Sequence, residues 1–191
     1  LVLLIGDIHI PHRAYAIPAK FRKLLVPNKM QHVLSTGNLC SREVLDYLRS
    51  LTGDVHVVRG DFDEDSTLSK NPDTKVVTVG HFRIGLIHGH QLVPWGSHEA
   101  LSQLAVQLEV DIMVSGHSHT CSCRSENGKL FLNPGSASGA FTPLKTDQEV
   151  VPSFMLLDVQ ADTVAVYVYR LADDAVKVER IMHKKHSTTE A

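Results

Sequence analysis

The sequence predicts a single α/β domain whose first half forms a parallel sheet covered by helices. The first observation is the order of segments over residues 1–59, where apolar strand-like runs alternate with helical stretches, as in parallel sheets. The second is that five apolar runs along the chain each end in residues that bind metal ions. Such an arrangement gathers ligands at one edge of a sheet. The third is size, because 191 residues are enough for one domain with a substantial core.

The composition is that of an ordinary soluble globular protein and excludes several functions. Hydrophobic residues make up 43% of the chain and charged residues 21%. The net charge of -2 argues against a general surface for nucleic acid or anionic membranes. No apolar run approaches the length of a membrane span. Three cysteines give no disulfide framework and suit a reducing compartment.

The first half contains three expected strands and two expected helices. Residues 1–5 form a continuous apolar run, which is typical of a strand buried on both faces. Pro18 suits the first turn of the helix that follows it. The expected strands cover 1–5, 32–35 and 55–59, and the expected helices cover 19–25 and 41–51.

The second half is richer in strands. An apolar stripe at helical spacing predicts one amphipathic helix over 98–108. Asn127-Gly128 is a type I′ turn signal that predicts a hairpin. We expect one domain over 1–182, followed by a disordered tail over 183–191. The expected strands cover 75–79, 82–87, 111–115, 121–125, 129–132, 153–158, 163–170 and 176–181, the last three as a meander.

Seven candidate metal ligands follow the apolar runs. They comprise two carboxylates, one carboxamide and four imidazoles. This mixed set suits a two-metal centre better than a single zinc, which usually takes four ligands. Neighbouring glycines allow the chain to turn sharply after a strand. The candidates are Asp7, His9, Asn38, Asp61, His88, His117 and His119.

Other side chains that bind metals elsewhere have simpler interpretations. Cys121 and Cys123 share one face of an expected strand, so core packing is favoured over a metal site. His32 and His56 lie inside strand-like runs and are expected to be core or sheet-surface residues. His183 lies in the expected polar tail and should be solvated.

The blocks around the seven candidates resemble those of the calcineurin-like metallophosphoesterases. The similarity covers nearly the whole chain and implies a four-layer αββα sandwich, in which two mixed sheets are flanked by helices. The blocks are Gly6-Asp7-x-His9, Gly37-Asn38, Gly60-Asp61-x-Asp63, His88-Gly89-His90 and Gly116-His117-Ser118-His119.

Longer strings are similar to one branch of that superfamily, the small subunits of the endosomal sorting complex retromer. These strings are 6–13, 18–21, 23–27, 36–40, 58–64, 85–91 and 176–181. The superfamily pattern implies two metal sites joined by a bridging ligand. One metal would be held by Asp7, His9 and His119, the other by Asp61, His88 and His117, with Asn38 as the bridge.

Two positions depart from the enzymes of the superfamily. The enzymes place an aspartate at Asn38 and an asparagine at Asp61, so the bridge here is a neutral amide. An amide is a weaker ligand than a carboxylate, which implies weakly bound Zn or Mn. Phe62 replaces a histidine that protonates the leaving group in many of the enzymes, and phenylalanine can exchange no proton. Whether Phe62 packs against a partner or fills its own loop stays open.

An apolar loop beside the metal site is the first candidate partner surface. The loop carries a proline and a tryptophan, which suits an exposed anchor, although Trp95 alone would fit equally well packed onto the domain. The resemblance implies docking against the C-terminal α-helical solenoid of the large retromer subunit. The residues involved would be Phe62, Leu92, Val93 and Trp95.

The C-terminal meander offers a second candidate surface. Tyr167 and Tyr169 alternate onto one strand face, where Leu156 and Val178 of neighbouring strands would join them. A buried sheet face is the usual interpretation, but tyrosine often marks a half-exposed binding surface. Regulators of retromer with short hydrophobic motifs would suit this patch.

The resemblance implies a non-catalytic scaffold subunit of retromer. Such a protein would be cytoplasmic and peripheral on endosome membranes, with membrane contact only through partners and no nucleic-acid partner. It would serve retrograde endosome-to-Golgi transport and the recycling of cargo. The alternative is a divalent-metal phosphodiesterase with a weakened two-metal site, which the seven retained donors keep open.

Overall fold

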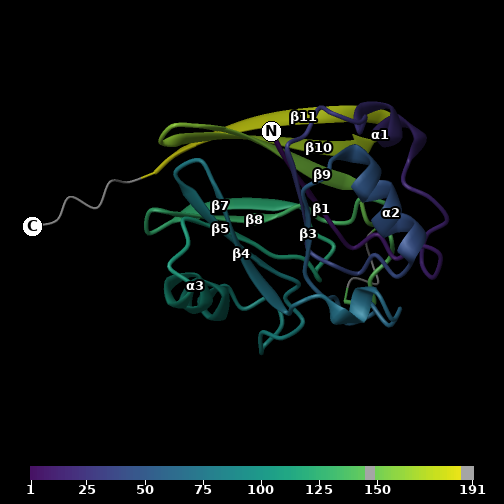
Figure 1. Ribbon diagram of the computed structural model, residues 1–191, viewed down its shortest axis with the longest axis horizontal. Helices are drawn as coiled ribbons and strands as arrows, with labels where there is room; N and C mark the ends of the chain where they lie inside the picture. The colour runs from purple at the N-terminus through teal and green to yellow at the C-terminus, as the bar shows by residue number, and fades with distance from the viewer. Residues whose placement is uncertain (145–148, 186–191) are drawn as a thin grey trace, which may run out of the picture.

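The computed structural model describes residues 1–144 and 149–185. Two β-sheets lie face to face, and helices lie on their outer sides (Figure 1). This arrangement confirms the expected α/β class and the four-layer sandwich with two mixed sheets. The helices are α1 (Ala19–Leu24), α2 (Arg42–Leu51) and α3 (His98–Gln107), with a 3₁₀ turn at Leu68–Lys70.

The first sheet joins the three early strands to the C-terminal meander. Its early strands are parallel to one another, as the β-α-β-α-β order predicted. The meander strands are antiparallel and attach to the sheet beside the first strand. The order across the sheet is β11 (Ala175–Lys184), β10 (Thr163–Ala172), β9 (Ser153–Gln160), β1 (Val2–Ile5), β2 (His32–Ser35) and β3 (Val55–Val57).

The second sheet has three parallel strands at its centre and an antiparallel strand at each edge. One edge is the predicted hairpin, which turns at Asn127 (φ 50°) and Gly128 (φ 74°). Both residues have the left-handed conformation that a type I′ turn requires. The order is β4 (Thr74–Val79), β5 (Phe82–Ile87), β6 (Ile112–Val114), β8 (Lys129–Asn133) and β7 (Ser122–Glu126).

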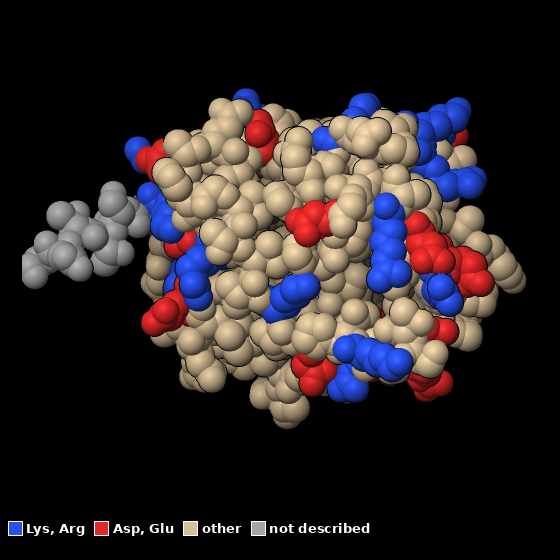
Figure 2. Space-filling view, viewed as in Figure 1, with Lys and Arg blue, Asp and Glu red and all other residues tan. Residues whose placement is uncertain are grey.

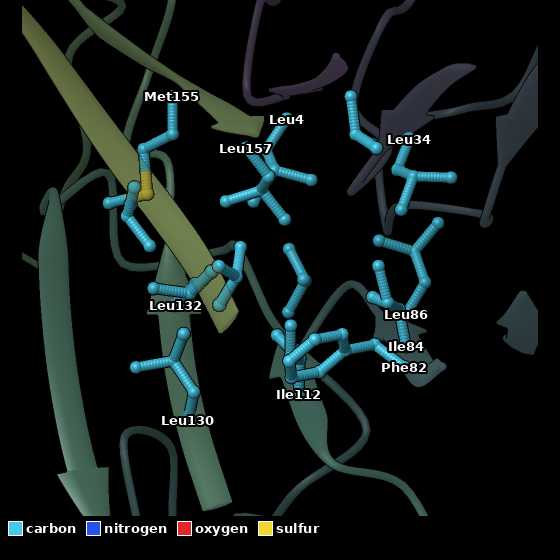
Figure 3. Close-up of a cluster of buried hydrophobic side chains, with 14 of the residues drawn as sticks. Leu4, Leu34, Phe82, Ile84, Leu86, Ile112, Leu130, Leu132, Met155 and Leu157 are labelled. Atoms are coloured by element: carbon cyan, nitrogen blue, oxygen red, sulfur yellow. The ribbon is translucent and has the colours of Figure 1, made fainter. Parts of the chain in front are cut away.

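The main hydrophobic core lies between the two sheets. Figure 3 shows Leu4 and Leu157 of the first sheet facing Ile112 and Leu132 of the second. Each of these side chains is at most 1% exposed. Burying a leucine or isoleucine side chain contributes roughly 1.5–3 kcal/mol, so this layer is a major source of stability.

Helices cover the outer faces of both sheets. Leu3 points away from the inter-sheet core and packs in a cluster with Phe21 of α1 and Leu48 of α2. The first strand is therefore buried on both faces, which explains its uninterrupted apolar sequence. On the other side, Ala105 of the predicted amphipathic helix α3 packs with Met113 of the second sheet.

The last strand is longer than the sequence predicted. Its expected end was Ile181, but β11 continues to Lys184 because its residues keep pairing with β10 as far as Thr163. His183, expected to be solvated in a tail, lies opposite Val164 and is 8% exposed. The rest of the expected tail, 186–191, lies outside the described residues.

Charged side chains of both signs are interspersed over the face shown in Figure 2. No large area of one sign is visible there, in keeping with the net charge of -2. Within the described ranges, the helices are all too short or too polar to cross a membrane.

Candidate metal site and its apolar rim

The seven predicted ligands lie together where strands of both sheets end. They follow β1, β2 and β3 of the first sheet and β5 and β6 of the second. Backbone hydrogen bonds join the loops, including Asp7 N to Gly37 O at 3.0 Å and Gly116 N to His88 O at 2.8 Å. Residues far apart in the sequence thus meet at one sheet edge.

Six of the ligands form two groups of three. Within each group, one ligating atom per residue lies within 4.8 Å of the others. This is the division that the resemblance implied. One group is Asp7, His9 and His119, and the other is Asp61, His88 and His117.

Left-handed backbone conformations concentrate at the ligands. The sequence predicted that glycines would supply the sharp turns, and Gly37 (φ 92°) and Gly89 (φ 115°) do so. Non-glycine residues rarely adopt this region, at a cost of roughly 1–3 kcal/mol each, and clusters of them are typical of functional sites. Five ligands have positive φ themselves: Asp7 (48°), His9 (49°), Asn38 (54°), His117 (70°) and His119 (53°).

Backbone carbonyls fix two of the imidazoles. His88 Nδ1 lies 2.7 Å from Thr36 O, and His119 Nδ1 lies 2.6 Å from Ala140 O. Because a carbonyl only accepts, both Nδ1 atoms carry a proton, and the Nε2 atom of each ring faces the site. Histidines that bind metals are oriented by such outer contacts.

The amide of Asn38 turns its nitrogen toward the ligands. Its Oδ1 accepts a hydrogen bond of 2.9 Å from Phe62 N, while its Nδ2 donates to Asp61 Oδ1 at 2.8 Å. The same Nδ2 lies 3.1 Å from His88 Nε2. The expected oxygen bridge between two metals therefore does not match this arrangement. If the amide were rotated by 180°, its oxygen would face the Asp61 carboxylate and its NH2 group would face the backbone N–H of Phe62. Both hydrogen bonds would then be lost.

Burial and neighbouring charges keep two imidazoles neutral at pH 7. Burial, followed by the proximity of His119, lowers the pKa of His9 to about 3. Burial, followed by the proximity of His88, lowers the pKa of His117 to about 4. For Asp61, burial alone would raise the pKa, but hydrogen bonds from His88 and Asn38 outweigh it and hold the pKa below its usual range. Neutral imidazoles and ionised carboxylates are the forms that bind metals.

Two buried atoms of the predicted ligands have no hydrogen-bond partner among the described residues. They are Asp7 Oδ1, in a side chain with no exposed area, and His117 Nε2. Leaving such atoms unsatisfied costs roughly 1–3 kcal/mol each. A divalent cation held by Asp7, His9 and His119 would satisfy Asp7 Oδ1, so the residues present fit a metal.

Asp63 organises the site although no role for it was predicted. Its buried carboxylate accepts hydrogen bonds from three backbone N–H groups, those of Asn38 (2.8 Å), Gly60 (2.9 Å) and Cys40 (3.0 Å). It ties the loop after β2 to the loop after β3. The only signal in the sequence is the second aspartate of the Gly60-Asp61-x-Asp63 block.

The mouth of the site has an apolar rim. Phe62 is 43% exposed and Trp95 57%, while Val93, two residues before Trp95 in the same loop, is 80% exposed. Leu92, also predicted on this surface, is half-buried and packs against the cluster under α3. A cavity of about 140 Å³ lies over the ligands and includes Phe62 and Trp95 in its lining, together with Leu144.

Two aromatic residues of this rim also contact ligands. The ring of Phe62 lies edge-on to His9, at 5.6 Å between centroids, and the Arg13 guanidinium lies 4.3 Å above it. The ring of Trp95 lies edge-on to His117, at 4.9 Å between centroids. Phe62 and Trp95 are thus exposed and at the same time held in place.

The second predicted surface lies on the outer face of the first sheet. The register pairs Tyr167 with Leu156 and Tyr169 with Val178, so the four side chains share one face. Tyr169 stacks on Phe154, with the ring centroids 4.6 Å apart, while Val178 is 53% exposed. The patch is thus partly buried where Tyr169 packs in the cluster under α1, and exposed to solvent at Val178 on β11.

Comparison with known proteins identifies the class that this fold and site define. Residues 1–162 match the model of the calcineurin-like phosphoesterase superfamily domain. The chain is 43% identical over 187 residues to vacuolar protein sorting-associated protein 29 of Schizosaccharomyces pombe, covering 97% of this chain and 98% of that protein. The chain therefore belongs to the calcineurin-like phosphoesterase superfamily and, within it, to the Vps29 family.

Solved structures of Vps29 proteins agree closely with this fold. The Vps29 of Chaetomium thermophilum has a TM-score of 0.90 at 43% identity, covering 97% of this chain and 98% of that one. A Vps29 of Entamoeba histolytica in complex with Zn²⁺ has a TM-score of 0.87 at 49% identity, covering 95% and 98%. The zinc complex belongs to that protein, whereas this chain shows two groups of side chains that fit a divalent metal.

Proposed function

We propose that this protein is a non-catalytic scaffold subunit of retromer, acting in endosomal protein sorting, retrograde transport and recycling of cargo. Membership of the Vps29 family supports this role. The observation that carries it is the apolar rim of Phe62 and Trp95 at the mouth of the metal site, together with exposed Val93 in the loop that carries Trp95. Exposed aromatic and aliphatic side chains around a pocket suit a protein partner better than a charged phosphate ester.

The amide of Asn38 argues against the phosphodiesterase alternative. Phosphate ester cleavage by two metals needs both ions clamped around a shared oxygen ligand and hydroxide. Here the residue between the two groups presents an NH2 group to Asp61 and His88. Phe62 next to it has no group that can protonate a leaving oxygen. Zn or Mn held at the two groups would be weakly bound, structural, and not required for the scaffold role.

The rim is the docking surface for the large retromer subunit, vacuolar protein sorting protein 35, through its C-terminal α-helical solenoid. Val93 is the anchor with the largest exposed fraction, so its loss is the sharpest test. We expect Val93→Asp to weaken binding of the purified large subunit about 30-fold or more, the effect of losing a hot spot worth roughly 2 kcal/mol.

The matched control is Val178→Asp, an exposed valine on the other surface. It should leave large-subunit affinity unchanged and weaken retromer regulators that carry short hydrophobic motifs. Val93→Asp should leave those regulators bound. If both variants lose the same partner, or if neither loses any, the assignment of the two surfaces is wrong. Through these partners the protein would reside in the cytoplasm, peripherally on endosome membranes.

A further inference from the structure

A second cluster of metal-binding side chains lies away from the site described above. His32, Asp54 and His56 each place one ligating atom within 4.8 Å of the others. His32 begins β2, Asp54 immediately precedes β3, and His56 lies within β3, the edge strand of the first sheet. The sequence predicted only core or sheet-surface roles for the two histidines.

The parallel ladder brings the three side chains to the same face. Leu34 of β2 pairs with His56 of β3. A hydrogen bond of 3.0 Å from Val33 N to Asp54 O fixes this register. His32 lies two residues before Leu34, and Asp54 lies two residues before His56, so all three share one side of the sheet. They gather where β2 and β3 begin, at the opposite end from Asn38 and Asp61.

The contacts within the cluster converge on one carboxylate. His56 Nε2 lies 3.0 Å from Asp54 Oδ1 and 3.1 Å from Oδ2, and His32 Nδ1 is bonded to Oδ2. The other nitrogen of His56, Nδ1, is buried and has no partner in the described part of the chain, so only Nε2 faces the carboxylate. Around a tetrahedral ion with bonds of roughly 2.0–2.2 Å, ligands lie about 3.3–3.6 Å apart, so these side chains need to separate by only a few tenths of an ångström to hold one.

The cluster is open to solvent. The exposed fractions are 30% for the His32 side chain, 47% for Asp54 and 19% for His56. Beside Asp54, a Cβ added at Gly53 would meet no atom within 4 Å. An ion can therefore enter without any rearrangement of the core, and water can complete its coordination.

We propose that His32, Asp54 and His56 form a second binding site for a divalent transition metal, independent of the site beneath the apolar rim. Two imidazoles and a carboxylate select borderline ions such as Zn²⁺ rather than Mg²⁺ or Ca²⁺. Three protein ligands leave one position of a tetrahedral ion open.

The test counts bound zinc ions per chain by native mass spectrometry and measures affinity by calorimetric titration of the full chain. The variants are His56→Asn and Asp54→Asn, and the control is His81→Asn, an exposed histidine outside both sites. We expect the two site variants to lose one bound ion relative to wild type, or to bind it at least about tenfold more weakly. His81→Asn should match wild type.

The proposal is wrong if Asp54→Asn and His56→Asn bind as many zinc ions as wild type, with the same affinity. The three side chains would then serve only to hydrogen-bond one another. Loss of an ion in His81→Asn would equally overturn the proposal by showing adventitious binding. If His56→Asn fails to fold by circular dichroism, Asp54→Asn decides, since its side chain is half exposed. Zinc-dependent shifts of the His32 and His56 ring nitrogens by NMR identify the ligands directly.

Discussion

At the scale of single residues, the neutral amide of Asn38 allows the side chains around it to pack together without a bound metal. Its Nδ2 donates to Asp61 Oδ1 at 2.8 Å, a position where a second carboxylate would meet like charge. Two carboxylates this close cannot both stay ionised unless a proton or a cation lies between them. The amide therefore lets Asn38 and Asp61 lie in direct contact with no ion between them.

Replacing this amide by a carboxylate tests that argument. We expect Asn38→Asp to lower the free energy of unfolding of the metal-free protein by about 1–3 kcal/mol, because a favourable hydrogen bond becomes a repulsive contact. Saturating zinc should restore more stability to this variant than to wild type. Denaturant unfolding with chelator and with zinc measures both effects. A variant as stable as wild type in chelator, with no greater response to zinc, would refute this view of Asn38.

The sequence predicted which side chains gather at the site better than it predicted how they are held. The strand ends and the imidazole and carboxylate side chains were visible, and the structure gathers all seven. The orientation of the Asn38 amide was not predictable, since it depends on Phe62 N–H, which the fold alone brings near. The role of Asp63 was hidden for the same reason, because its three partners are backbone groups of two separate loops.

At the scale of elements, the site depends on how closely the ends of β2 and β3 approach. A Cβ at Gly60 would lie 2.1 Å from Asn38 Oδ1 and 2.4 Å from Asn38 N. One of these atoms belongs to the backbone, so the loops would have to separate. At Gly53, just before β3, an added Cβ would meet nothing within 4 Å.

These two glycines form a matched pair for mutation. We expect Gly60→Ala to lower the free energy of unfolding by about 3 kcal/mol through overpacking. Gly53→Ala should change it by no more than about 0.5 kcal/mol. Chemical denaturation of both variants decides the point. Equal stability of Gly60→Ala and wild type would mean that the approach of the two loops is not a constraint.

Elements with strong local signals were predicted, and those defined by distant contacts were not. The continuous apolar run of β1 and the Asn127-Gly128 turn agree with the structure. The end of β11 was placed too early because His183 and Lys184 look like the start of a polar tail in isolation, whereas pairing with β10 extends the strand over them. The packing of His183 follows from that pairing.

At the scale of the whole molecule, one sheet built from both ends of the chain and one built from its middle meet to form one site. The fold is that of the phosphoesterase superfamily, and in the proposed scaffold the amide between the metal groups and the apolar residues at the mouth would serve a partner rather than a phosphate ester. The proposed outcome is a rigid surface on which a helical solenoid docks. The metal groups then stabilise this surface without performing chemistry.

The most direct measurement combines large-subunit binding with a phosphodiester hydrolysis assay in manganese, for wild type and Asp61→Ala. Asp61 belongs to the second metal group, and its side chain is 27% exposed, so its removal disrupts that group while leaving the apolar rim in place. We expect both proteins to bind the large subunit with equal affinity and neither to hydrolyse the diester. Hydrolysis by wild type that is lost in Asp61→Ala would contradict the scaffold account and make the protein an enzyme.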